Sequence, residues 1–276
     1  MKQVILKRRS IRSFQKKELT LEDQASIKKL LKQYEQVKGP FGNTIRLYLL
    51  NLNEEKGPES KIVGMYGYIK NAPAFIAGST KNTFEGLIDY GYIFQAVLLE
   101  LSKRGFGNVW LGGDFQRSDL KGFARKGDVV PSVSPVGYPA KVSWREKFLR
   151  NRQEAHTREV FSSRFFNGNL GTPIRDDQAQ KHPFYDYLEL VRLAPSALNK
   201  QPWRVIVDGQ KCHFYLQRTP GFKHQDIDVE MLNMGVAMHH FEIGLNDDKR
   251  RFSVLRLDDA PKHKSLDYVV TYEIDA

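Results

Sequence analysis

Hydrophobic positions in the first part of the chain recur with a helical period and then with strand-like runs. Ile27, Leu30, Leu31 and Tyr34 lie at helical spacing, and Thr20 with Asp23 is placed to cap that helix. Apolar runs follow, and the helical pattern then returns over a longer stretch that ends at a basic turn and a glycine. The predicted elements after the capped helix are strands at 45–52 and 74–77 and a long helix at 87–103.

The second part of the chain repeats this order. Asp208-Gly209 is typical of a hairpin turn between two strands. The predicted elements are a helix at 184–193, strands at 204–207 and 211–217, a long helix at 229–245, and strands at 253–257 and 268–272. We therefore predict two similar halves, 1–144 and 171–276, joined by a basic connector at 145–170.

Composition is that of an ordinary globular protein. The chain has 276 residues, of which 41% are hydrophobic and 12% aromatic, too many for a disordered chain. No uncharged run approaches the roughly 20 residues of a membrane span, and the N-terminus lacks the apolar core of a secretory signal. These features, with a single cysteine, Cys212, predict a cytoplasmic protein with no membrane partner.

The net charge of +11 and the pI near 9.5 give the surface a field that attracts anions. A nucleic-acid-binding protein usually gathers its basic residues in one stripe beside exposed aromatics, whereas here they are spread along the chain. The densest basic segment, 145–158, is most simply a solvated connector. Binding of a flavin phosphate or of nucleic acid there is the alternative, and nucleic acid is disfavoured.

Two segments carry the most specific chemistry. They are Arg8-Arg9-Ser10-Ile11-Arg12-Ser13-Phe14 and Ala194-Pro195-Ser196-Ala197-Leu198-Asn199-Lys200-Gln201-Pro202-Trp203, hereafter the arginine segment and the Pro-Ser-Asn segment. Together they resemble the flavin-binding signatures of the nitroreductase family. In that family both occur in one subunit, a helix apart, and each flavin site of the dimer takes one segment from each subunit. Here most of the chain separates them.

The resemblance implies an α+β fold, a nitroreductase-like α-β-α sandwich with a mixed, largely antiparallel sheet flanked by helices. The displacement implies two such halves in an intramolecular pseudo-dimer, which could act as a monomer. When residues are counted along both halves, Thr172-Pro173-Ile174-Arg175 falls at the position equivalent to the arginine segment. The region 38–44 falls at the position equivalent to the Pro-Ser-Asn segment. Each half thus keeps the segment that the other has lost, which predicts one composite flavin site per chain.

The cofactor implied by the resemblance is flavin mononucleotide, FMN. Arginine and serine side chains suit its phosphate, and Arg12 occupies the family position that stabilises negative charge on the reduced ring. A glycine backbone allows close approach of the ring. Arg145 or Lys147 would be a further phosphate ligand. The candidate cofactor-binding residues are Arg8, Arg9, Ser10, Arg12, Gly112, Gly113, Pro195, Ser196, Ala197, Asn199, Arg145 and Lys147.

The function implied is FMN-dependent oxidoreduction in a ping-pong cycle. NADH or NADPH would donate a hydride, and a nitroaromatic, quinone or similar small acceptor would take it, with no catalytic side chain of the protein's own. A protein that stores flavin or uses it in a specialised reaction is the alternative. No metal site is expected, because His239 and His240 are adjacent on a helix and point about 100° apart. Cys212 is expected in the core.

Overall fold

The computed structural model describes residues 1–51, 69–112, 120, 122–141, 159–222 and 227–275. The elements of the first half are α1 (Lys2–Lys7), α2 (Leu21–Tyr34), β1 (Arg46–Asn51), β2 (Ala74–Lys81), α4 (Phe84–Lys103), β3 (Gly107–Asn108), β4 (Asp128–Val129) and β5 (Val133–Gly137). Those that follow are β6 (Phe165–Asn167), α6 (Tyr185–Arg192), β7 (Trp203–Asp208), β8 (Lys211–Leu216), α7 (Val229–Asp247), β9 (Phe252–Leu255) and β10 (Asp267–Ile274). Three short 3₁₀ helices are η2 (Phe161–Ser163), η3 (Ala179–Lys181) and η4 (Ala197–Asn199).

The described strands form two sheets, one in each half. The first has the order β1-β2-β5-β3, with β4 also paired to β2, and all of these pairs are antiparallel. The second has the order β6-β7-β8-β10-β9, in which only β6 and β7 are parallel. This confirms the predicted α+β class with a mixed, largely antiparallel arrangement.

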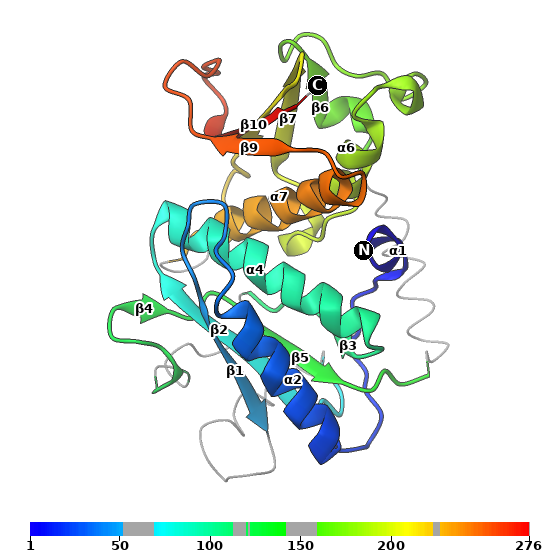
Figure 1. Cartoon of the computed structure of the whole chain (residues 1–276), viewed down its shortest axis with the longest axis vertical. Helices are drawn as coiled ribbons and strands as arrows, with labels where there is room; N and C mark the ends of the chain where they lie inside the picture. Colours follow the sequence, from blue (N-terminus) through cyan, green and yellow to red (C-terminus); the bar gives the residue numbers. More distant parts are fainter. Residues whose placement is uncertain (52–68, 113–119, 121, 142–158, 223–226, 276) are drawn as a thin grey trace.

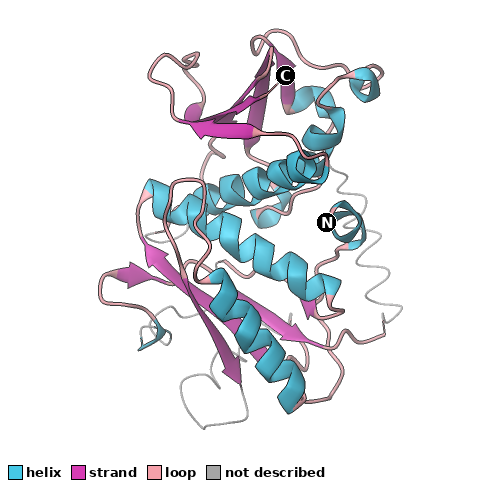
Figure 2. Cartoon of the chain, viewed as in Figure 1, coloured by secondary structure: helices cyan, strands magenta, loops and turns pink. Residues whose placement is uncertain are grey.

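The two long helices α4 and α7 lie between the two sheets and pack on each other (Figure 1). Figure 2 shows the resulting layers, with strands on the outside of the helix pair and α2 against the first sheet. Both helices are buried around most of their circumference, and their side chains belong to one continuous core. The packing of α4 on α7 therefore unites the halves.

Glycines at the helix crossing reveal an approximate two-fold symmetry. A Cβ atom at Gly91 would overlap the carbonyl oxygen of Leu232, and one at Gly235 would overlap that of Ile88. Positions 88 and 232, like positions 91 and 235, differ by 144 in the sequence. The same offset in both contacts shows that equivalent faces of α4 and α7 meet, as in an isologous dimer interface.

Most of the elements expected from periodicity are present. Thr20 caps α2, because its Oγ1 accepts a hydrogen bond from the Asp23 backbone amide at 3.1 Å. The hairpin β7–β8 turns at Gly209, whose φ is +56°. Cys212 is fully buried, and burial raises the pKa of its thiol. No helix in the described ranges is both long enough and apolar enough to cross a membrane.

Part of the range expected to be a connector belongs to the second sheet. Residues 142–158 lie outside the described residues, but β6 pairs with β7 from Phe165↔Val205 to Asn167↔Val207. Phe165 and Phe166 are both buried, in cores on opposite faces of the sheet. A strand of three residues is too short to show in a periodicity pattern, so the sequence did not reveal it.

Candidate functional site

The Pro-Ser-Asn segment forms a strained loop between α6 and β7. Leu198, Asn199 and Gln201 have φ values of +48°, +56° and +48°, in the left-handed region that non-glycine residues seldom occupy. The Leu198 side chain is also 78% exposed. Strained backbone of this kind gathers at ligand-binding sites, where surrounding contacts hold it in place.

Buried polar contacts hold this loop in its shape. The Gln201 amide donates to Ser196 Oγ at 2.9 Å, and the fully buried Gln201 side chain accepts from the Glu159 amide at 3.3 Å. Trp203 is fully buried directly after the loop. The loop is therefore anchored at Gln201 and Trp203 and leaves Leu198 at the surface.

Helix α7 provides a further anchor through Asn233. The Asn233 Oδ1 accepts a hydrogen bond from the Ala197 amide at 3.1 Å, and the Asn233 side chain is buried. Its Nδ2 is buried without a hydrogen-bond partner among the described residues. A buried amide donor without a partner is costly, so the Asn233 amide offers a ligand its two unused N–H donors beside the loop.

Gly112 lies close to the same helix. A Cβ at Gly112 would meet Val229 Cγ1 at 3.5 Å, an ordinary contact, and Val229 is one helical turn before Asn233. Gly112 therefore lies next to the first turn of α7. Gly113, the other predicted glycine, lies outside the described residues.

The arginine segment reaches this region through β3. The Ile11 amide donates to the Asn108 carbonyl at 3.0 Å, and the chain runs from Asn108 to Gly112 in four residues. Phe14 is buried and bridges to Pro139, which fixes the end of the segment. Arg8, Ser10 and Arg12 are partly exposed and Arg9 is exposed.

The helices that precede the two segments lie side by side. Lys2 of α1 forms a salt bridge with Asp186 of α6 at 3.3 Å, and Ile5 packs in one cluster with Leu190 and Leu193. The salt bridge holds the start of α1 next to the start of α6, and α1 also packs on α4 and α7.

A buried chain of hydrogen bonds crosses between the halves near this point. Trp110 Nε1 donates to Gln95 Oε1 at 2.8 Å, and Gln95 Nε2 lies 2.9 Å from His240 Nε2. His240 Nδ1 lies 2.9 Å from the Leu190 carbonyl oxygen. If Gln95 donates to His240, the imidazole carries its proton on Nδ1 and donates to Leu190. This chain of hydrogen bonds fixes the position of Trp110, which is close to Gly112, relative to the end of α6.

The two degenerate counterparts have other contacts. Arg175, opposite Arg12 in the sequence count, forms an exposed bidentate ion pair with Asp177, with both N···O distances at 3.1 Å. In the region 38–44, the Phe41 and Asn43 amides donate to Asp89 at 2.9 and 2.8 Å. Asp89 occupies in α4 the position of Asn233 in α7, since the two also differ by 144.

Asp89 and Asn233 thus show how the two symmetry-related positions differ. Both accept hydrogen bonds from a loop, but Asp89 receives bonds from two backbone amides and from the Asn43 side chain. Burial raises the pKa of Asp89, and these bonds partly offset that effect. Of these two side chains, only Asn233 has a hydrogen-bond donor without a partner among the described residues.

Sequence reasoning missed Asn233, Gln95 and Trp110. The signal for Asn233 is a single polar residue within Met231-Leu232-Asn233-Met234-Gly235-Val236-Ala237. Two other predicted ligands, Arg145 and Lys147, lie outside the described residues. Of the two adjacent histidines, His240 is in the buried hydrogen-bond chain, and His239 packs edge-on against Tyr92 at a centroid distance of 4.7 Å.

Two helix-covered sheets joined through a symmetric helix pair, with a strained loop at their junction, define a nitroreductase-type protein. The chain belongs to the family described as "Putative TM nitroreductase", whose model matches residues 1–245. A Thermotoga maritima protein solved as "a putative nitroreductase" shares the fold across the whole chain. It is 19% identical, with a TM-score of 0.61, over 98% of this chain and 91% of that one.

Shorter solved structures align with about half of this chain. An FMN-dependent nitroreductase from Clostridium difficile is 20% identical, with a TM-score of 0.41, over 52% of this chain and 90% of that one. A nitroreductase with bound FMN from Bacteroides fragilis is 15% identical, with a TM-score of 0.40, over 51% and 89%. No curated protein matches the chain.

Proposed function

We propose that this protein is an FMN-dependent oxidoreductase that takes a hydride from NADH or NADPH and reduces a small acceptor such as a nitroaromatic or quinone. The observation that carries the proposal is that the Pro-Ser-Asn segment and Gly112, far apart in the sequence, both lie against the first two turns of α7. The Pro-Ser-Asn segment meets Asn233, Gly112 meets Val229, and β3 links the arginine segment to Gly112.

The residues present fit a flat, anionic cofactor. Asn233 Nδ2 is a buried donor without a partner in the described structure, and it lies one helical turn from Val229, the residue next to Gly112. The loop around Leu198 is strained and leaves an apolar side chain exposed. An aromatic ring with carbonyl acceptors would satisfy the donor and cover the apolar side chain.

Each segment has a part in holding FMN. Arg8, Arg9 and Ser10 would bind the phosphate, with Arg145 or Lys147 as further ligands. Arg12 would lie beside the part of the ring that becomes negative on reduction, which favours the reduced state. Pro195, Ser196, Ala197 and Asn199 would border the ring and ribityl chain from the other half, and the backbone of Gly112 and Gly113 would approach the ring.

FMN, when bound, supplies the hydride-transfer chemistry, so no catalytic acid or base is required of the chain. The protein's residues hold the ring, favour its reduced charge and shape one pocket for donor and acceptor in turn. Because Arg175 is paired with Asp177 and the Phe41 and Asn43 amides are bound to Asp89, we propose one such site per chain.

The test is the flavin content and reactivity of the purified protein. We expect one FMN per polypeptide, loss of visible flavin absorbance with NADH or NADPH under anaerobic conditions, and its return when a nitroaromatic or quinone is added. Two tightly bound FMN molecules per chain would contradict the single composite site. A flavin that the nicotinamides reduce only very slowly would instead indicate a storage or specialised function, and a colourless protein with salt-dependent DNA affinity would indicate nucleic-acid binding.

A further inference from the structure

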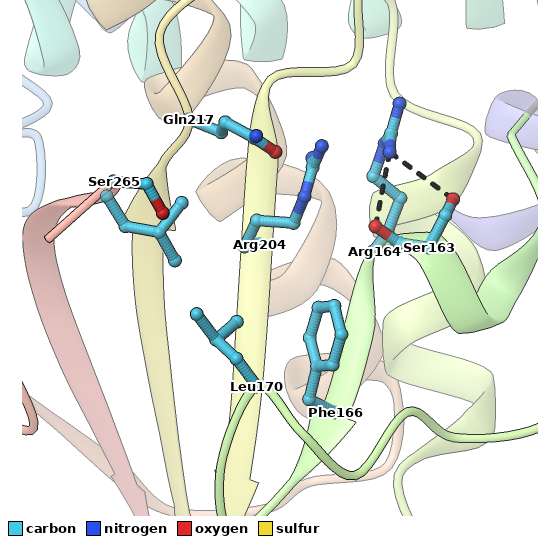
Figure 3. A pocket seen from close by; sticks show the side chains of 8 residues that line it. Ser163, Arg164, Phe166, Leu170, Arg204, Gln217 and Ser265 are labelled. Atoms are coloured by element: carbon cyan, nitrogen blue, oxygen red, sulfur yellow. Dashed lines mark hydrogen bonds between the residues drawn. The ribbon is translucent and has the colours of Figure 1, made fainter. Parts of the chain in front are cut away.

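A pocket of about 370 Å³ lies on the second sheet (Figure 3). Arg204 and Ile206 alternate along β7 with Val205, which packs in the core together with α7. Arg204 therefore lies on the sheet face opposite α7. The residues lining the pocket are Ser163, Arg164, Phe166, Leu170, Arg204, Gln217, Ser265 and Leu266.

Two arginines enter this pocket from adjacent chain segments. Arg164 immediately precedes β6, its carbonyl accepts from the Val205 amide at 2.9 Å, and Arg204 is the second residue of β7. Figure 3 shows the two side chains extending in the same direction, with the Gln217 amide close to Arg204. Like charges held together in this way repel each other unless an anion lies between or beside them.

Arg164 has unused hydrogen-bonding capacity. It is only 8% exposed, and its Nη1 donates to the carbonyl and hydroxyl oxygens of Ser163 at 3.1 and 3.3 Å. Its Nε is buried without a partner in the described part of the chain. Among the described residues, its carboxylate contact is with the half-exposed Glu159 at 3.6 Å.

Arg204 is held mainly by carbonyl groups. Its Nη1 donates to the Trp203 and Gln201 carbonyls at 2.6 and 3.3 Å, and no carboxylate of the described residues lies within 4.0 Å of it. Burial first, and then the charge of Arg164, lower the pKa of Arg204 to about 10. The pocket lining thus carries two guanidinium groups, and Glu159, which lies beside Arg164 but does not line the pocket, offsets one of their charges.

The remaining lining is apolar on one side. In Figure 3 the guanidinium and amide groups lie at one end of the pocket, and Phe166 and Leu170 lie at the other. The volume is near the lower end of the roughly 300–1,000 Å³ of small-molecule sites. A singly charged oxyanion with a compact apolar group matches this division of charge and surface.

We propose that this pocket binds a small organic carboxylate whose apolar group rests on Phe166, Leu170 and Leu266 and whose carboxylate accepts hydrogen bonds from Arg164 and Arg204. A carboxylate has two oxygen atoms that can accept hydrogen bonds from guanidinium groups, so it is a suitable partner for Arg164 and Arg204. The pocket lies on the opposite face of the second sheet from α7, whereas Ala197 of the proposed FMN site is bonded to α7, and the two regions adjoin at Gln201, whose carbonyl accepts from Arg204. Binding here does not depend on the proposed redox function.

The test is calorimetric titration of the purified full-length protein with cyclohexanecarboxylate at low salt, with inorganic phosphate as a second arm. The ring of this probe is not aromatic, so it does not mimic a nitroaromatic that stacks on a flavin. We expect saturable binding of the carboxylate, much weaker binding of phosphate, and a loss of affinity of roughly tenfold or more in Arg204→Gln.

A second pair of variants keeps the test valid if Arg204→Gln fails to fold. Ser265 is exposed at the pocket, and Ser253 is exposed on β9 in the same sheet but outside the pocket. We expect Ser265→Glu to weaken carboxylate binding severalfold by charge repulsion and Ser253→Glu to leave it unchanged. Flavin content should be the same in both.

Three outcomes would overturn the proposal. They are no saturable carboxylate binding by the unaltered protein, equal affinity in all the variants, or phosphate affinity as high as that of the carboxylate. None of these depends on whether the protein carries FMN or reacts with nicotinamides, so failure here is distinguishable from failure of the proposed function.

Discussion

Arg12 and Arg175 occupy equivalent sequence positions in the two halves, but their surroundings differ. Arg12 belongs to a segment bonded to β3 on one side and, through its own carbonyl, to Lys70 on the other. Arg175 is exposed and paired with Asp177. The difference supplies a matched control within one chain.

We expect Arg12→Ala to weaken FMN binding roughly tenfold to a hundredfold, because one charge-assisted hydrogen bond contributes about 1.5–3 kcal/mol. The midpoint potential of bound FMN should also become more negative, since a cation beside the reduced ring is lost. Arg175→Ala should change neither quantity. Equal behaviour of the two variants, measured by flavin titration and redox titration, would remove Arg12 from the site.

Glu242 is a buried carboxyl group that joins three elements. Tyr92 of α4 and Tyr272 of β10 donate hydrogen bonds to it at 2.5 and 2.7 Å, and it lies on α7. Burial raises the pKa of Glu242, and these two hydrogen bonds offset only part of the effect. Its protonation is therefore coupled to folding.

The sign of the pH dependence follows from the raised pKa. Between the unfolded pKa, about 4.3, and the higher folded pKa, the folded state binds more protons. The free energy of unfolding therefore falls as the pH rises through this window. In the unaltered protein this decrease should amount to about 1.4 kcal/mol for each unit by which the folded and unfolded pKa values differ. We expect the decrease to be absent in Glu242→Gln.

Urea unfolding of both proteins across that pH range measures the effect. Glu273→Gln serves as the control, because Glu273 is about half exposed on β10 and forms a long ion pair with Lys211 at 3.7 Å. Parallel curves for the unaltered protein and Glu242→Gln would show that Glu242 has the same pKa in the folded and unfolded states.

At the scale of whole elements, the crossing of α4 and α7 is the closest contact between the halves. Gly91 and Gly235 each face a carbonyl oxygen of the other helix, and a Cβ at Gly235 would also lie 2.6 Å from the Tyr92 amide nitrogen. These contacts are with backbone atoms, which cannot move aside as a flexible side chain can. Glycine is required there by packing.

We expect Gly235→Ala to lower the free energy of unfolding by about 3 kcal/mol or more, because overpacking at a backbone contact forces the helices apart. Gly91→Ala should have a similar effect. Gly122→Ala is the control, since a Cβ there would meet no atom within 4 Å. Denaturant midpoints give the comparison, and a fully stable Gly235→Ala would mean that α4 and α7 cross with more space than described.

The helices and most strands could be predicted from the sequence because their periodicity is local. Thr20 as a cap, the turn at Gly209 and both long helices required only neighbouring residues. The left-handed conformation of Leu198 and Gln201 could not be predicted, because neither residue favours it and tertiary contacts impose it. The same holds for Asn233, whose partner is 36 positions away.

The whole molecule has the plan of a dimer inside one polypeptide. The sequence count predicted two halves and one composite site, and the symmetry at the helix crossing agrees with the first of these. What the count could not supply was how the two counterpart segments are held. Asp89 binds the Phe41 and Asn43 amides, and Asp177 pairs with Arg175.

Because α4 and α7 share one core, we expect the two halves to unfold together. The hydrophobic cluster that contains Phe94 and Val97 of α4 also contains Met234 and Phe241 of α7, so neither helix could stay folded alone without exposing a large apolar face. A single cooperative transition is the expected result.

Tryptophans in each half make this measurable. Trp110 packs on Phe94 at a centroid distance of 4.9 Å, and Trp203 is fully buried at the start of β7. Replacing the other two tryptophans by phenylalanine in turn gives one protein that reports on each half. In each variant the fluorescence midpoint in urea should coincide with the midpoint of the far-ultraviolet circular dichroism. A fluorescence transition clearly separated from the circular dichroism transition in either variant would show that the halves are independent domains, and that the shared helix core is weaker than its burial implies.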